Sequence, residues 1–275
     1  MIDLIVSQGR VADKTARTVV GAVRTAIALE QRYQIKGNAV GKAAPAATDD
    51  WSVSLPQARE NLIDLGAAVS ASIKRGNLTI LASNTCPASI ATLPVVAREY
   101  PDAVVLWIDA HGDFNTPETT DTGYLGGMVV SAACGLWDSG HGAGLRPEQV
   151  ILIGARDVDR SERELLNRAG VRIIPPAQVT PQTVLNAING AQVWVHIDWD
   201  VLEPGFVPAD YQVPDGVFPA QLRALFEAIP LKQILGIELA EFNAPTDDAS
   251  NNKALSIILD IVAPVFEKLA AERTL

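Results

Sequence analysis

The sequence predicts an α/β fold in which one doubly wound, mostly parallel sheet is flanked by helices in three layers. Apolar segments of strand length recur along the 275 residues, and several are separated by stretches with apolar residues at helical spacing. The apolar segments are continuous rather than alternating, which is typical of parallel strands buried on both faces. With 48% apolar residues, the chain can form one large domain, which we place at residues 1–275.

The expected elements follow one another in a regular order. Strands are expected at residues 4–6, 78–82, 103–108, 150–153, 171–174, 193–197 and 234–239. Helices are expected at residues 160–169, 219–228 and 253–269. Ser161 is the expected N-cap of the first helix, and Gly170 its C-terminal stop. Loops are expected at residues 35–50, 116–127 and 203–216.

Composition excludes several classes of protein. The net charge of −10 argues against a nucleic-acid partner, which would require basic patches. No run of about 18 apolar residues indicates a membrane span, and polar Asp3 and Gln8 interrupt any signal-peptide apolar region. Two cysteines are too few for a disulfide scaffold, so a reduced cytoplasmic location is expected.

Two acidic clusters stand at the ends of predicted strands. Asp109, His111 and Asp113 follow one strand, and Asp198 and Asp200 follow another. Residues two apart on a strand point to the same side, and ligands of doubly wound sheets gather at the carboxyl ends of the strands. Four converging carboxylates would repel one another unless a cation lay between them. The clusters therefore predict a metal centre, although a single Asp at a strand end is usually a cap or turn residue.

The donor set favours two Mn²⁺ ions, with Fe²⁺, Co²⁺ and Zn²⁺ as alternatives. Two ions about 3.5 Å apart would hold a shared hydroxide and support hydrolysis. Among other polar residues, Glu241 follows a strand and faces the same edge, but a solvated loop residue or a salt bridge is the more common role of such a residue than substrate binding. Asp157 and Asp159 could be helix caps. His196 is expected to support a metal ligand rather than bind metal, and His141 to lie in an exposed loop.

Two motifs resemble those of the arginase (ureohydrolase) family of binuclear manganese enzymes. They are Asp109-Ala110-His111-Gly112-Asp113 and Asp198-Trp199-Asp200-Val201-Leu202-Glu203-Pro204, and the family has a third Asp where Glu203 stands. The resemblance extends from Ser7 to Asn243. It implies an arginase-like fold and a metal ligand set of Cys86, Asp109, His111, Asp113, Asp198 and Asp200, in which Asp109 and Asp198 bridge the ions.

The resemblance also implies roles in catalysis and substrate binding. Asp113 would pass a proton from the bridging hydroxide to the leaving amine, and Glu241 would hold the guanidinium-like end of the substrate. Three residues match the loop that binds the α-carboxylate of an amino acid, and one matches the carboxylate that recognises its α-amino group. The former are Asn115, Thr120 and Thr122, and the latter is Asp159.

Two further departures from the family pattern matter. Cys86 stands where most members have a histidine ligand, and Gly126 stands where arginases have a histidine. A thiolate is a soft ligand, so the metal site shared by Cys86 and Asp113 should be the weaker one. The alternative for Cys86 is a buried, inert thiol.

Both departures suggest an altered substrate. The cysteine resembles that of a branch of the family that serves D-cycloserine biosynthesis and hydrolyses Nω-hydroxy-L-arginine to L-ornithine and hydroxyurea. The alternatives are an arginase or agmatinase activity on another guanidino compound, or a metal-binding relative without turnover. The expected partner is a small guanidino amino acid, with no nucleic acid or membrane, and a homo-oligomer is an open alternative because relatives are often trimers or hexamers.

Overall fold

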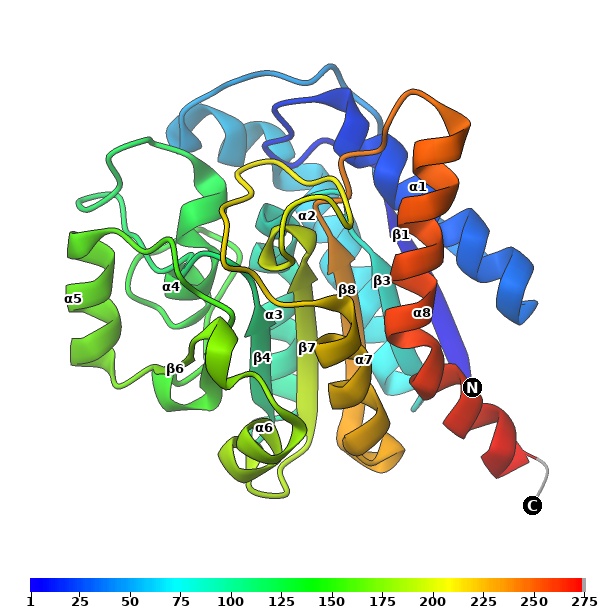
Figure 1. The fold of residues 1–275 in the computed structure, drawn as a ribbon. Helices are drawn as coiled ribbons and strands as arrows, with labels where there is room; N and C mark the ends of the chain where they lie inside the picture. Colours follow the sequence, from blue (N-terminus) through cyan, green and yellow to red (C-terminus); the bar gives the residue numbers. More distant parts are fainter. Residues whose placement is uncertain (274–275) are drawn as a thin grey trace.

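A computed structural model describes residues 1–273, which form one eight-stranded sheet with helices on both faces (Figure 1). All pairings between neighbouring strands are parallel. The strands are β1 (Ile2–Ser7), β2 (Gly37–Val40), β3 (Leu78–Ala82), β4 (Val104–Ile108), β5 (Val150–Ile153), β6 (Arg172–Ile174), β7 (Val193–Asp198) and β8 (Ile234–Ala240). The predicted doubly wound α/β sheet is confirmed.

The helices connect these strands and cover the sheet. They are α1 (Ala16–Tyr33), α2 (Trp51–Lys74), α3 (Ser89–Glu99), α4 (Val129–Ala133), α5 (Arg160–Ala169), α6 (Pro181–Ile188), α7 (Pro219–Ala228) and α8 (Asp248–Arg273). Short 3₁₀ helices lie at η1 (Cys86–Ala88), η2 (Leu125–Met128), η3 (Pro147–Gln149), η4 (Pro176–Gln178), η5 (Trp199–Val201) and η6 (Leu231–Gln233).

Strand alternation divides the buried apolar residues into two cores. On one face, Leu106 and Ile108 of β4 pack with residues of α1, α6, α7 and α8. On the other face, Val105 and Trp107 of the same strand pack with residues of α2, α3, α4 and α5. Figure 1 shows α7 and α8 in front of the sheet and α2 and α3 behind it. Burial of both faces explains why the strands are continuously apolar in the sequence.

The strand order places the predicted site at the centre of the sheet. The order is β2-β1-β3-β8-β7-β4-β5-β6, so β3, β8, β7 and β4 are neighbours although they are distant in the sequence. Because all strands are parallel, their carboxyl ends meet at one edge. The segments that follow these four strands carry Cys86, Glu241, Asp200 and Asp109.

Two predictions about secondary structure and helix capping were wrong. The predicted loop at 35–50 contains the edge strand β2, which pairs with β1 and is partly exposed. Its sequence, Gly-Asn-Ala-Val, has no apolar run, because an edge strand need not bury both faces. The N-cap of α5 is Asp159, not Ser161, which lies in the first turn, while Gly170 ends the helix in a left-handed conformation as expected.

Residues 274 and 275 of the predicted single domain lie outside the described part of the chain, and the division into domains stays a prediction. Among the described helices, none is long and apolar enough to cross a membrane.

Candidate functional site

Two predicted catalytic residues have an unusual backbone conformation. Asp113 and Glu241 have φ angles of +50° and +63°, in the left-handed region that residues with a side chain seldom adopt. Such conformations are retained where the surrounding structure imposes them, often at functional sites. Both side chains line the same cavity at the carboxyl edge of the sheet.

The two acidic clusters predicted from the sequence meet around His111. The Nδ1 atom of His111 lies 2.9 Å from Oδ2 of Asp200 and 3.2 Å from Oδ1 of Asp109. Backbone amides fix these carboxylates: Ala110 donates to Asp200 and His111 donates to Asp109, at 3.0 and 2.7 Å. Although burial lowers the pKa of His111, Asp109 and Asp200 outweigh this effect and raise it strongly.

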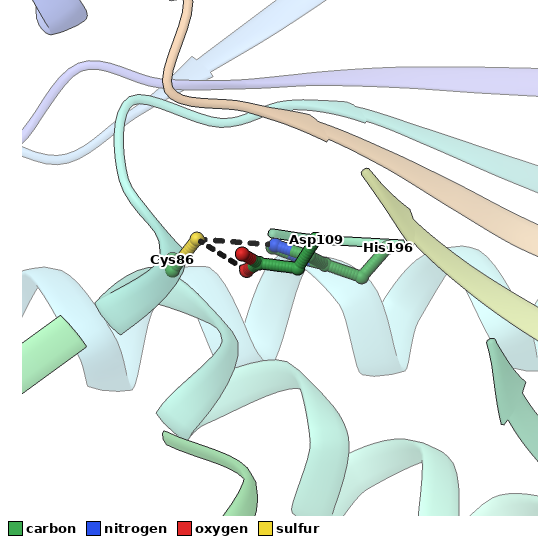
Figure 2. A group of neighbouring side chains, drawn as sticks. All are labelled: Cys86, Asp109 and His196. Atoms are coloured by element: carbon green, nitrogen blue, oxygen red, sulfur yellow. Dashed lines mark hydrogen bonds between the residues drawn. The ribbon is translucent and has the colours of Figure 1, made fainter. Parts of the chain in front are cut away.

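Cys86 lies against both clusters at the start of η1. Its Sγ atom is 3.2 Å from Oδ2 of Asp198 and 3.9 Å from Oδ2 of Asp109, and its backbone amide donates to Glu241 Oε1 at 2.9 Å. Figure 2 shows Sγ directed toward Asp109 and toward the imidazole of His196, whose Nε2 is 3.3 Å away. The thiol therefore faces the predicted metal ligands and is not isolated in the apolar core.

A fully buried polar network lies beneath Cys86. His196 Nδ1 is 2.8 Å from Glu238 Oε2, and Glu238 also accepts hydrogen bonds from the hydroxyls of Ser89 and Thr92. The imidazole stacks on the ring of Trp107, with centroids 3.7 Å apart. Burial raises the pKa of Glu238, but hydrogen bonds from His196, Ser89 and Thr92 outweigh it and lower the pKa overall.

If all its carboxyl groups ionised, the site would carry more negative charge than its own cationic groups balance. Burial, followed by nearby carboxylates, raises the pKa values of Asp113 and Asp198 well above the usual range, and burial does the same for Glu241. Burial and Asp109 raise the pKa of Asp200 from 3.8 to about 6. These carboxylates resist ionisation without a cation, as expected for metal ligands.

The donor atoms are also close enough to share metal ions. Three groups each bring their ligand atoms within 4.8 Å of one another: Cys86, Asp109 and His196; Cys86, Asp198 and Glu241; and Asp109, His111 and Asp200. Carboxylate, imidazole and thiolate donors suit divalent transition metals. Five of the six predicted ligands belong to these groups, but Asp113 belongs to none of them, and His196 and Glu241 do although they were not predicted as ligands. The residues present thus fit a metal centre, while their individual roles stay predictions.

A cavity of about 270 Å³ opens above the acidic clusters. The predicted substrate residues Asn115, Thr120, Thr122, Asp159 and Glu241 all line it. Asp159 is exposed, and its side chain makes no capping hydrogen bond at the start of α5. The predicted ligands Cys86, His111, Asp113, Asp198 and Asp200 also reach the cavity, whereas Asp109 is buried below it.

Other residues contribute to the site without having been predicted. Glu162 lines the cavity, accepts the Phe114 amide at 2.8 Å and has a pKa raised by burial from 4.5 to about 7. Glu162 is three residues after Asp159, a spacing that places two side chains on the same side of a helix. This spacing could have indicated from the sequence that Glu162 faces the same cavity as Asp159. Lys14, Tyr124 and Tyr211 also line the cavity, and Glu238 lies beneath it. His141, expected in an exposed loop, is half-buried.

The missing side chain at Gly126 is explained by Tyr124. A Cβ atom at position 126 would lie 2.3 Å from Cε1 and 2.9 Å from Cζ of the Tyr124 ring. The phenol ring therefore occupies the space into which a side chain at 126 would project.

Comparisons with known proteins agree with this geometry. The Arginase family model matches residues 9–263. The chain is 66% identical to Nω-hydroxy-L-arginine amidinohydrolase of Streptomyces lavendulae, over 98% of this chain and 99% of that protein. The arginase structure from Bacillus caldovelox is 25% identical, with a TM-score of 0.81 over 96% of this chain and 97% of that one.

The fold is also shared with Entamoeba histolytica arginase in complex with L-ornithine. The TM-score is 0.85 at 19% identity, with 96% of this chain and 97% of that chain covered. Because the family model spans most of the sequence, the chain belongs to the arginase family.

Proposed function

We propose that this enzyme hydrolyses Nω-hydroxy-L-arginine to L-ornithine and hydroxyurea with two Mn²⁺ ions. The observation that carries the proposal is the 66% identity, over nearly the whole of both chains, to a protein named for this substrate. The reaction adds water to the guanidino carbon and breaks its bond to the side-chain nitrogen, which leaves as the amine of ornithine.

The proposed ligands come from the two acidic clusters and Cys86. By the family resemblance, Asp109 and Asp198 would be shared between the ions, Cys86 and Asp113 would complete one site, and His111 and Asp200 the other. The contacts of Cys86 with Asp198 and of His111 with Asp200 support this grouping. Bound metal would supply a water-derived nucleophile at neutral pH and stabilise charge that develops at the guanidino carbon. Mn²⁺ suits a donor set dominated by carboxylates.

The remaining side chains would orient the substrate. Glu241, fixed by the Cys86 amide, would pair with the planar hydroxyguanidine, and Asp113 would deliver a proton to the departing amine. The α-amino group would meet Asp159, and the α-carboxylate would meet the hydroxyls and amide of the segment that follows Asp113. These last groups are Asn115, Thr120 and Thr122, all of which line the cavity.

A paired substrate assay tests the proposal. Ornithine release is measured from Nω-hydroxy-L-arginine, L-arginine and agmatine after manganese reconstitution, and hydroxyurea is measured in parallel. The proposal predicts the highest kcat/KM on the hydroxylated substrate. Much faster hydrolysis of arginine or agmatine would establish the alternative activity, and full metal content without turnover of any of them would indicate a binding protein.

A cytoplasmic location and a homo-oligomeric assembly remain predictions. Cell fractionation and light scattering of the purified protein would check them. A role in antibiotic biosynthesis is likewise part of the proposed function. Antibiotic production by a strain that lacks the gene would test it.

A further inference from the structure

Lys14 is the one cationic side chain of lysine or arginine among the described residues that line the cavity. The other charged or titratable groups there are mostly carboxylates, including Asp113, Asp159 and Glu241. A lysine in such surroundings would be expected to form an ion pair. Among residues 1–273, however, no ion pair joins Lys14 to a carboxylate.

Aromatic groups hold the ammonium instead. The Nζ atom of Lys14 lies 3.8 Å from the centroid of the Tyr124 ring and 4.9 Å from that of Tyr211, and it donates to the Tyr211 hydroxyl. Cation–π contacts attract an ammonium without neutralising its charge. The positive charge of Lys14 thus remains available to an anion in the cavity.

Hydrogen bonds fix the two backbone segments that carry Lys14 and Tyr211. Asp13, next to Lys14, is buried and accepts hydrogen bonds from Val11, Thr18 and Asn84 at 2.7, 2.6 and 2.6 Å. The loop that carries Tyr211 is tied down by Arg156, which donates to the carbonyl oxygens of neighbouring loop residues, including that of Val213 at 2.7 Å. Lys14 is therefore presented from a fixed backbone and does not lie on a free surface tail.

We propose that Lys14 binds the α-carboxylate of the amino acid substrate and so selects amino acids over decarboxylated amines. This inference rests on the proposed function and deepens it. The hydroxyguanidine end must reach Glu241 and the acidic clusters, so the α-carboxylate lies at the other end of the substrate, within the cavity that Lys14 also lines. There it would be repelled by the surrounding carboxylates unless a cation faced it.

The expected effect follows from the strength of a charge-assisted hydrogen bond. Such a bond contributes roughly 1.5–3 kcal/mol, which corresponds to about 10- to 100-fold in affinity. The neutral groups Asn115, Thr120 and Thr122 can donate to the same carboxylate, but only Lys14 supplies a full opposing charge. The preference for a carboxylate should therefore depend on Lys14.

Binding of the product and of its decarboxylated analogue tests this inference without turnover. L-Ornithine and putrescine are titrated calorimetrically into the manganese-loaded protein, its Lys14→Met and Lys14→Gln variants, and the control Lys42→Met. Lys42 is an exposed lysine on another loop, with 89% of its side chain accessible. Thermal melting curves identify any variant that is misfolded, and the second Lys14 variant then carries the test.

The parent protein and Lys42→Met are expected to bind ornithine at least 10-fold more tightly than putrescine. Both Lys14 variants should lose about 10- to 100-fold in ornithine affinity, with no comparable loss for putrescine. A folded Lys14 variant that keeps the preference for ornithine would overturn the assignment, as would a parent protein without that preference. Failure of the parent to hydrolyse hydroxyarginine would instead overturn the proposed function.

Discussion

Removal of metal should leave a protein whose stability falls as the pH rises. The raised pKa of Asp200 shows why: its carboxyl titrates near 3.8 when unfolded and at about 6 when folded. The folded state therefore holds the proton more tightly, and its stability decreases as pH rises between these two values. A difference of roughly two pKa units, at about 1.4 kcal/mol per unit, amounts to about 3 kcal/mol.

Other groups act in the same direction. The pKa of Glu162 is raised from 4.5 to about 7, and those of Asp113, Asp198 and Glu241 are also raised. Asp109 and Glu238 have lowered pKa values, so the stability they contribute is lost only as pH falls through those lowered values. Between pH 5 and pH 8 these two groups stay ionised in both states and contribute little change.

The assay is urea unfolding of chelator-treated protein at pH 5 and pH 8, followed by the fluorescence of its five tryptophans. The metal-free protein should be less stable at pH 8 by at least 1 kcal/mol, the portion of the Asp200 effect expected in this window at about 1.4 kcal/mol per unit. Manganese should stabilise the protein more at pH 8 than at pH 5, because its ligands must be deprotonated. Equal or greater stability of the metal-free protein at pH 8 would refute the view that these carboxylates require a cation.

Three further substitutions probe the surroundings of the site. Cys86→His should raise manganese retention after dialysis, measured as metal per chain, and a stoichiometry no higher than that of the parent would count against Cys86 as a ligand. Glu238→Gln should lower the free energy of unfolding by about 3 kcal/mol, because an amide NH₂ would face buried donors. Urea unfolding measures this loss. A loss below about 1 kcal/mol would show that Glu238 is not needed as the acceptor for His196, Ser89 and Thr92. Gly126→Ala should destabilise the protein by about 1–3 kcal/mol through contact with the Tyr124 ring. If Tyr124→Ala does not relieve that loss in a double-mutant cycle, the ring is not its cause.

The sequence predicts the parts of the site that lie within one segment. Asp109, His111 and Asp113 follow one strand, and Asp198 and Asp200 stand at the end of another, so the rule that ligands gather at the carboxyl ends of parallel strands suffices to bring the two clusters to one edge. Strand alternation does not align them, because Asp109, His111 and Asp113 lie in the loop after β4 and Asp200 lies in η5. The short edge strand β2 was missed because nothing in its four residues distinguishes it from a loop. Its pairing with β1 depends on contacts that the local sequence does not encode.

Residues brought together by strand register could not be predicted. His196 lies directly opposite Glu238 in the pairing of β7 with β8, which are separated by α7 in the chain. The sequence shows that both follow apolar residues, but it does not specify which residues of two strands face each other. Lys14 and Tyr211 are likewise far apart in sequence, and their hydrogen bond depends on how two loops cross the same edge of the sheet.

The buried layer below the carboxylates explains how the donor atoms are held in place. Trp107 and His196 each lie two residues before a predicted bridging ligand, so alternation puts them on the same face as Asp109 and Asp198, one step deeper in the sheet. Trp107 donates to Asp109 Oδ2 at 3.1 Å and stacks on His196, which contacts Cys86 Sγ and is bound in turn by Glu238. Since all of these groups are buried, a shift of one must displace the next. The orientation of the thiol and of a predicted bridging carboxylate is therefore set from within the protein, by side chains that do not themselves reach the cavity.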